Sequence, residues 1–213
     1  MRVIATVGLP GSGKSEAAAV ADELGIPVVA MGDVIRAECR DRGLDPATHH
    51  GRVAKALRAE GGPAAIAERS LPIIEARLAD AEGDVDTDDS AGTGVSATVD
   101  TETVLVDGVR SGAEVDRFEA AFGEAFTLVS IEAPLNVRAE RVAARGRDTP
   151  TEDGGESLTD RDARERGFGM DDAIGRADVT ITNTDSLDAF RARVETVLRT
   201  GPEALDDPDP PRS

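Results

Sequence analysis

Residues 8–15 constrain the fold of this chain more than any other segment. They read Gly-Leu-Pro-Gly-Ser-Gly-Lys-Ser and match the pattern G-x-x-x-x-G-K-[ST] at every fixed position. An apolar, β-branched run at residues 2–7 precedes them and a helical stretch from Glu16 follows, which is the context that this pattern requires. Backbone N–H groups of such a loop point into one concavity, and the helix N-terminus adds positive potential. The segment therefore predicts a cradle for phosphate groups. Its candidate binding residues are Gly8, Pro10, Gly11, Ser12, Gly13, Lys14 and Ser15.

Further apolar runs alternate with helical stretches along the chain. The runs that we interpret as buried parallel strands are residues 2–7, 26–31, 103–107, 126–134 and 179–183. Three helical patterns fill residues 33–79, with breaks near residues 43–46 and 61–63. Strands that alternate with helices are typical of a parallel sheet covered on both faces. We therefore expect an α/β fold of three layers around a five-stranded parallel sheet.

An excess of acidic residues limits the partners of the protein. The chain has 42 Asp and Glu against 24 Lys and Arg, a net charge of −18. This field repels nucleic acid and anionic membranes, so we expect neither as a partner. Only Lys14 and Lys55 are lysines, and an acid excess with arginine in place of lysine resembles the proteins of extreme halophiles.

Two acidic segments lack the apolar residues that a packed core needs. Residues 80–102 are of low complexity and carry eight acids and no base, and residues 200–213 are rich in proline and acid. We expect the first to be a disordered surface insertion and the second a disordered tail.

The remaining composition favours a cytoplasmic protein. No apolar run reaches the roughly 18 residues of a transmembrane helix, and the first ten residues lack a signal-peptide layout. The single cysteine, Cys39, excludes an internal disulfide and any zinc site that needs two thiolates. We expect a monomer or a small homo-oligomer.

Three other classes of nucleotide-binding protein fit the sequence less well. A dinucleotide-binding fold is disfavoured by Lys14 and Ser15 and by the lack of an acidic residue at the end of the second strand. GTPases carry an N-K-x-D guanine motif that is missing from the sequence. In motor-type ATPases an acidic residue ends a strand, as Asp107 does here, but Gly108-Val109-Arg110 follows at once.

The segment Asp107-Gly108-Val109-Arg110 is similar to one found in adenylate kinases. Three more segments extend the likeness: the motif at 8–15, Met-Gly-Asp-Val-Ile-Arg at 31–36, and Arg-Val-Ala-Ala-Arg at 141–145. The chain thus resembles P-loop nucleotide kinases of the adenylate kinase and dephospho-CoA kinase type, and most closely a haloarchaeal family of such proteins. Residues 177–190 are closer to dephospho-CoA kinases. The resemblance implies a kinase domain over residues 1–199, with an acceptor-binding helical subdomain at 32–80 and a lid at 146–168.

The same resemblance implies ATP and Mg²⁺ as cofactors and assigns residue roles. Lys14 and the loop amides hold the phosphates of ATP, while Ser15 and Asp107 organise Mg²⁺. The acceptor is expected to contact Asp33, Arg36 and Arg110, and the transferred group is expected to contact Arg141 and Arg145. Asn183 is expected near the adenine. Two of the three lid arginines Arg161, Arg164 and Arg166 are expected to clamp the triphosphate.

Asp33 separates two kinds of acceptor. A phosphate acceptor needs no base, and Asp33 would then orient Mg²⁺-bound water. A hydroxyl acceptor, as in dephospho-CoA, needs a carboxylate to take its proton, and Asp33 stands where that base is expected; a helix N-cap role fits both. Met31 replaces the small hydroxyl residue of adenylate kinases, so AMP is not assigned as the acceptor.

The sequence therefore favours an ATP- and Mg²⁺-dependent phosphotransferase with a nucleotide-like, small-molecule acceptor. A hydroxyl kinase of the dephospho-CoA type and an ATP-binding regulatory protein with little turnover stay open. His49 and His50 are adjacent, so they face different directions on a helix, and we interpret them as surface or packing residues.

Overall fold

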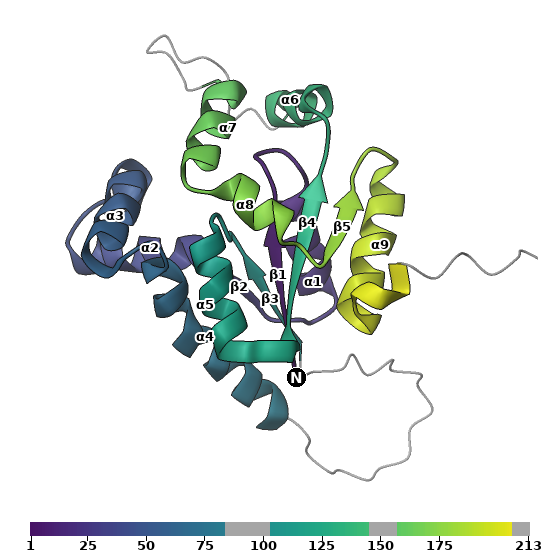
Figure 1. The fold of residues 1–213 in the computed structure, drawn as a ribbon, viewed down its shortest axis with the longest axis horizontal. Coiled ribbons are helices and arrows are strands. Elements are labelled where there is room, and N and C mark those ends of the chain that lie inside the picture. Colours follow the sequence, from purple (N-terminus) through teal and green to yellow (C-terminus); the bar gives the residue numbers. More distant parts are fainter. Residues whose placement is uncertain (84–102, 145–156, 206–213) are drawn as a thin grey trace, which may run out of the picture.

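The computed structural model describes residues 1–83, 103–144 and 157–205. Its centre is a five-stranded parallel sheet with the strand order β2-β3-β1-β4-β5 (Figure 1). The strands are β1 (Arg2–Val7), β2 (Val28–Ala30), β3 (Thr103–Asp107), β4 (Phe126–Glu132) and β5 (Val179–Thr182). The fold class expected from the alternation of apolar and helical segments is confirmed.

The second strand is shorter than the predicted 26–31. Ile26 donates its N–H to Ala21 O at 2.9 Å and so still belongs to the turn after α1. Met31 already begins a helix. The apolar character of both residues reflects burial rather than strand structure, since Ile26 and Met31 are 3% and 2% exposed.

Two layers of helices cover the two faces of the sheet (Figure 1). Alternating residues of each strand pack against one layer or the other. Val3, Ala5 and Val7 of β1 join the larger core cluster, whereas Ile4 joins the smaller one. Helices α4 (Ala65–Gly83), α5 (Gly112–Phe122) and α8 (Met170–Gly175) pack on the first face. Helices α1 (Lys14–Glu23) and α9 (Leu187–Thr200) pack on the second. This period of two, with both faces apolar, is why the strands read as continuous hydrophobic runs.

Two helices beside the sheet precede α4. Helix α2 (Met31–Asp41) starts directly after β2, and α3 (Pro46–Gly61) packs against α2 and α4. Asp45 caps α3 by accepting the Ala47 N–H at 3.0 Å, and Pro46 occupies the first turn, where its missing N–H costs nothing. The three helices agree with the helical patterns expected within residues 33–79.

The carboxyl side of the sheet carries a second helical group. Helix α6 (Leu135–Ala144) follows β4, and α7 (Leu158–Gly167) leads into α8. Short 3-10 helices lie at η1 (Gly123–Ala125) and η2 (Pro202–Leu205). None of the helices in the described ranges is long and apolar enough to cross a membrane.

Three expectations meet the limits of the described residues. Residues 80–83 complete α4 instead of opening the acidic insertion, and 84–102 lie outside the description. Residues 201–205 follow α9 and include η2. Leu205 packs against the smaller core cluster, so this part of the expected disordered tail is ordered. Residues 206–213 lie outside the description, as do residues 145–156, which include Arg145 and the first part of the expected lid, residues 146–156.

Candidate functional site

The glycine-rich loop between β1 and α1 has the backbone shape of a phosphate cradle. Gly13 has a φ of 126°, and a Cβ there would stand 2.4 Å from Asn183 Nδ2. Asn183 itself donates to Ser12 O at 2.8 Å and is 4% exposed. The glycine therefore allows β5 to brace the loop from behind, which L-residues with a side chain would prevent.

Lys14 lies at the start of α1 beneath this loop. Its Nζ donates to the carbonyl oxygens of Gly8 and Leu9. Burial lowers the pKa of Lys14 from 10.5 to about 8, although the nearby Asp107 carboxylate opposes the shift. A partly buried cation whose hydrogen bonds within the described residues go to loop carbonyls is well suited to receive a phosphate anion.

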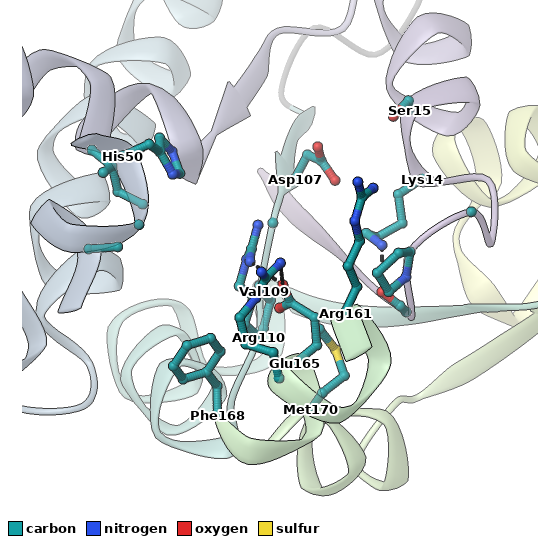
Figure 2. A pocket seen from close by; sticks show the side chains of 18 of the residues that line it. Lys14, Ser15, His50, Asp107, Val109, Arg110, Arg161, Glu165, Phe168 and Met170 are labelled. Carbon is teal, nitrogen blue, oxygen red and sulfur yellow. Dashed lines mark hydrogen bonds and ion pairs between the residues drawn. The ribbon is translucent and has the colours of Figure 1, made fainter. Parts of the chain in front are cut away.

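Asp107 ends β3 opposite the loop. Thr6, its neighbour in the sheet, donates from Oγ1 to Asp107 Oδ1 at 3.1 Å. Figure 2 shows the Asp107 carboxylate on the same side of the cavity as Ser15 and above Lys14. Asp107 and Ser15, the two groups expected to organise Mg²⁺, thus line the same cavity.

The loop residues, Lys14, Ser15 and Asp107 line a cavity of about 820 Å³. Its walls come from the loop, α3, the segment after β3, and α7 with the turn that follows it (Figure 2). The volume lies near the upper end of the usual range for small-molecule sites, about 300–1,000 Å³. The cavity lies at the carboxyl ends of the parallel strands, which is the common position of ligand sites in α/β sheets.

One face of α3 forms a cationic wall of this cavity. The residues of α3 that line it are His50, Gly51, Ala54, Lys55 and Arg58. They recur at helical spacing, so they share one face of the helix. Glycine and alanine in the middle leave space, while a lysine, an arginine and a histidine surround it.

Glu114 joins this wall to the segment after β3. Its fully buried carboxylate accepts from Arg58 Nη2 at 3.1 Å and from the Arg110 N–H at 2.8 Å. Burial raises the pKa of Glu114, and these donors offset part of that cost. The Arg58 guanidinium also lies 5.2 Å from the centre of the Phe168 ring. Glu114 therefore fixes the position of Arg58 and of the backbone at Arg110.

Helix α7 supplies the opposite wall. Arg161, Arg164 and Glu165 line the cavity, and Glu165 Oε1 accepts from Arg110 Nη1 at 2.6 Å. Arg166 does not line it and donates instead to Asp171 Oδ1 at 3.2 Å. Two of the three arginines expected in the lid thus face the cavity.

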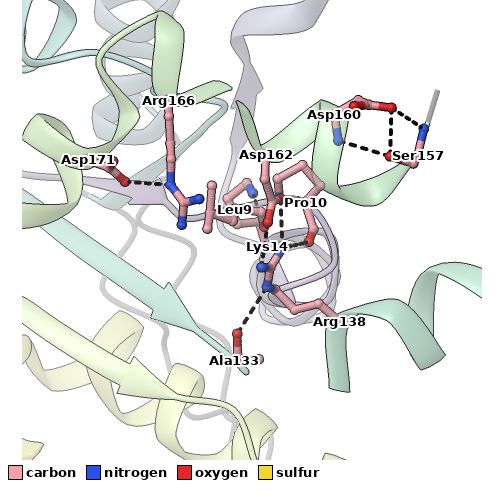
Figure 3. A network of polar contacts seen from close by, with 10 residues as sticks. All are labelled: Leu9, Pro10, Lys14, Ala133, Arg138, Ser157, Asp160, Asp162, Arg166 and Asp171. Atoms are coloured by element: carbon pink, nitrogen blue, oxygen red, sulfur yellow. Dashed lines mark hydrogen bonds and ion pairs between the residues drawn. The ribbon is translucent and has the colours of Figure 1, made fainter. Parts of the chain in front are cut away.

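A buried ion pair attaches α7 to the glycine-rich loop (Figure 3). Arg138 of α6 binds both oxygens of Asp162 at 2.9 and 2.7 Å. The same guanidinium donates to Pro10 O at 3.0 Å and to Ala133 O at 3.1 Å. The helix begins in a reciprocal cap between Ser157 and Asp160. One arginine thus connects the glycine-rich loop, α6 and α7.

Several residues expected at the site lie elsewhere. Asp33 and Arg36 pair with each other at 2.7 Å on the exposed surface of α2, and neither lines the cavity. Arg141 donates to Asn183 Oδ1 at 3.0 Å and to Ser12 O at 3.4 Å, so it contacts the back of the loop. Of the acceptor residues expected from the resemblance, the structure brings only Arg110 to the cavity.

His50, interpreted from the sequence as a surface or packing residue, belongs to the lining of the cavity. Its Nε2 atom is buried without a hydrogen-bond partner in the described structure, and burial lowers its pKa. Sequence reasoning also missed the cavity residues Lys55, Arg58 and Glu165. For Lys55 and Arg58 the signal was the helical spacing of the basic residues in α3, which an exposed charged helix shares. Glu165 of α7 gave no such signal.

The residues present fit Mg²⁺ and the triphosphate of ATP. Mg²⁺ in nucleotide sites keeps several waters and takes one or two carboxylates plus phosphate oxygens, so Asp107 and the Ser15 hydroxyl are a sufficient protein contribution. Among the described residues, no group of three or more His, Cys, Asp or Glu side chains is arranged for a metal. The buried Ser12 Oγ in the loop also lacks a partner there.

Comparison with known proteins places this site in a family. Residues 7–158 match a family model described as an AAA domain. A UPF0200 protein of Halobacterium salinarum strain R1 is 56% identical over 209 residues, covering 98% of each chain. A UPF0200 protein of Methanothrix thermoacetophila is 45% identical and covers 93% of this chain and 97% of its own.

Two solved structures share the fold at low sequence identity. TT1252 from Thermus thermophilus has a TM-score of 0.54 at 22% identity, covering 92% of this chain and 96% of its own. Shikimate kinase from Acinetobacter baumannii, in complex with shikimate, has a TM-score of 0.51 at 14% identity, with coverages of 97% and 94%. The likeness shows a P-loop kinase-like α/β fold. With its haloarchaeal and methanogen relatives and its phosphate cradle, the chain belongs to the UPF0200 family.

Proposed function

We propose that this protein is an ATP- and Mg²⁺-dependent phosphotransferase whose acceptor is a small molecule, of nucleotide type, that receives the phosphoryl group on an oxyanion. One observation carries the proposal: the phosphate cradle with Lys14 and the cationic face of α3 open into the same cavity. A donor phosphate and an anionic acceptor can therefore meet there without solvent between them.

The donor end of the cavity supports the ATP assignment. The loop amides and Lys14 would hold the β- and γ-phosphates, and Arg161 and Arg164 of α7 face the same space. Mg²⁺ would supply positive charge that stabilises the phosphate oxygens during transfer. Asp107 and Ser15 would hold it. Phosphoryl transfer needs positioning and cations more than covalent help, and this end of the cavity supplies both.

The acceptor end supports an oxyanion. Lys55, Arg58 and Arg110 border it, and arginine pairs with two phosphate oxygens at once. In the reaction, an acceptor oxygen forms a bond to the γ-phosphorus as the bond from that phosphorus to the β–γ bridging oxygen breaks. An acceptor oxygen that already carries negative charge gives up no proton in this step.

The position of Asp33 argues against a hydroxyl acceptor. A hydroxyl kinase needs a carboxylate within hydrogen-bond reach of the acceptor, yet Asp33 is exposed and paired with Arg36. Within the described ranges, the carboxylates that line the cavity are Asp107 and Glu165. The first is needed for Mg²⁺ and the second is paired with Arg110, so this geometry favours the nucleoside monophosphate kinase type of reaction over the dephospho-CoA kinase type.

The test is ADP release from Mg-ATP in molar KCl, with AMP, CMP, UMP, GMP, dTMP and dephospho-CoA as separate acceptors. Molar salt suits the acid-rich composition and the Halobacterium relatives. We expect one or more monophosphates to stimulate ADP release and to appear as diphosphates. Stimulation by dephospho-CoA alone would contradict the oxyanion acceptor. ATP binding without stimulation by any acceptor would favour the regulatory alternative.

A further inference from the structure

Helix α7 carries two buried acids, one helical turn apart, that differ in their pairing. Asp162 and Glu165 are each 4% exposed. Both oxygens of Asp162 are bound by Arg138. Glu165 has one oxygen on Arg110 at 2.6 Å, and its Oε2 is buried without a hydrogen-bond partner in the part of the chain that the structure describes. A buried carboxylate oxygen left without a donor costs free energy, so Glu165 is held in place less favourably than Asp162.

The two acids also differ in what they face. Asp162 does not line the cavity, and its partner arginine binds backbone oxygens of the donor loop and of the segment after β4. Glu165 lines the cavity, with Arg110 on one side and Arg164 Nη2 at 3.6 Å. Figure 2 shows the Glu165 carboxylate directed at Arg110 from α7. An anionic group thus already occupies Arg110 at the acceptor end.

We propose that the Glu165 carboxylate occupies the subsite of the acceptor's oxyanion, and that an acceptor binds by displacing Glu165 from Arg110. The inference rests on the proposed function, because it concerns the acceptor end of the same cavity. A phosphate dianion offers more charge and more acceptor oxygens than one carboxylate oxygen, so it takes the guanidinium. Acceptors without such a group leave the pair intact and bind weakly. Glu165 is therefore a specificity-determining residue that selects for strongly anionic acceptors.

Inorganic phosphate is the probe, and a double-mutant cycle locates its site. Phosphate affinity of the full chain is measured by calorimetry in molar KCl for wild type, Glu165→Gln, Arg110→Ala and the double variant. Glutamine keeps the shape of the side chain and removes the competing charge. We expect Glu165→Gln to tighten phosphate binding by about 5- to 50-fold, within the range of interaction energies between groups in direct contact. The gain should vanish in the Arg110→Ala background.

Asp171→Asn is the matched control. It removes one negative charge from an exposed side chain of α8 that pairs with Arg166 and does not line the cavity. Its phosphate affinity should equal that of the wild type. An equal gain in this variant, or a gain from Glu165→Gln that persists without Arg110, would assign the effect to general charge or to phosphate in the glycine-rich loop, and would overturn the proposal.

Hydrogen exchange of the wild type tests the same idea without a variant. Phosphate should speed the exchange of amides in α7, because the attachment through Glu165 is released while that through Asp162 stays. Unchanged exchange at saturating phosphate would overturn the displacement. If Glu165→Gln has no effect although Arg110→Ala weakens phosphate binding, the acceptor site stands and only the role of Glu165 fails. If Arg110→Ala also has no effect, the acceptor site of the proposed function fails with it.

Discussion

The two ends of the cavity are built in opposite ways. The donor end comes from one continuous segment, residues 8–15, with Asp107 added by the neighbouring strand. The acceptor end comes from α3, the segment after β3 and α7, joined by pairs such as Arg58–Glu114 and Arg110–Glu165 that lie 56 and 55 residues apart. The chemistry of a continuous segment depends on one stretch of sequence, whereas an end built from three separate segments can change through any of them.

Because the two ends are built differently, substitutions at each end should affect different measurable properties. Variants at the donor end should affect ATP and every acceptor alike. Variants at the acceptor end should affect one substrate, and variants of the connecting ion pairs should affect stability. The following experiments are ordered from the largest expected effect to the smallest.

Lys14→Ala should remove turnover and leave the fold intact. The cation that stabilises the transferring phosphoryl group is lost, and removing one such group typically costs about 10³-fold in rate. ADP release measures the rate, and thermal unfolding in molar KCl measures stability. Stability should not fall, because burial disfavours the charged form of Lys14. A variant that retains its rate would contradict the phosphotransfer mechanism.

Arg138→Ala should destabilise the protein by about 3–5 kcal/mol, because Asp162 is left as a buried and unpaired charge. The free energy of unfolding is measured by chemical denaturation in molar KCl. Arg166→Ala is the control: it breaks an exposed pair with Asp171 and should cost less than about 1 kcal/mol. Equal losses from the two variants would contradict the role of Arg138 as the link between the donor loop and α7.

Lys55→Ala should raise the KM for the acceptor by about 10- to 100-fold, the usual cost of a lost hydrogen bond to a charged group. The KM for ATP should not change. Arg52→Ala provides a matched control, because Arg52 lies on the same helix and does not line the cavity. A change in the KM for ATP in the lysine variant would mean that the two ends of the cavity are not separate.

ATP affinity should fall as the pH rises through about 8, the pKa of Lys14 in the free protein. A triphosphate favours protonated Lys14 and raises its pKa in the complex, so binding takes up a proton above pH 8. Below pH 8 Lys14 is protonated in both states, so its titration does not change the affinity for ATP. Above pH 8, the Kd should rise by about tenfold for each pH unit. Calorimetry in buffers of different ionisation enthalpy detects the proton, and Lys14→Ala should abolish this dependence.

Asp33→Asn should change kcat by less than about twofold, because Asp33 is exposed and outside the cavity lining. A general base contributes about 10²–10⁴-fold, so the size of the effect separates the two kinds of acceptor. Steady-state kinetics with the best acceptor gives the result. A loss of 100-fold or more would restore Asp33 as the base of a hydroxyl kinase.

The sequence by itself determined the sheet and the donor end. Period-two burial, β-branched residues and the spacing of glycine, lysine and serine act over a few neighbouring residues, and their signals stay readable before folding. Strands and loop therefore agree with expectation apart from strand ends. β2 omits Ile26 and Met31, where burial without strand pairing gives the same apolar pattern, and β4 and β5 end at Glu132 and Thr182.

Only the tertiary structure decided the acceptor end. Whether an arginine faces a cavity depends on how its helix is rotated against its neighbours. Arg36 and Arg58 look alike in sequence, yet Arg36 pairs with Asp33 on the surface while Glu114 holds Arg58 at the cavity. Arg138 and Asp162 form a buried pair across 24 residues, although each reads as part of an exposed, charged helix. Side-chain direction follows from helix packing, and the packing is set by the apolar residues of the whole chain, not by the charged residues that it brings together.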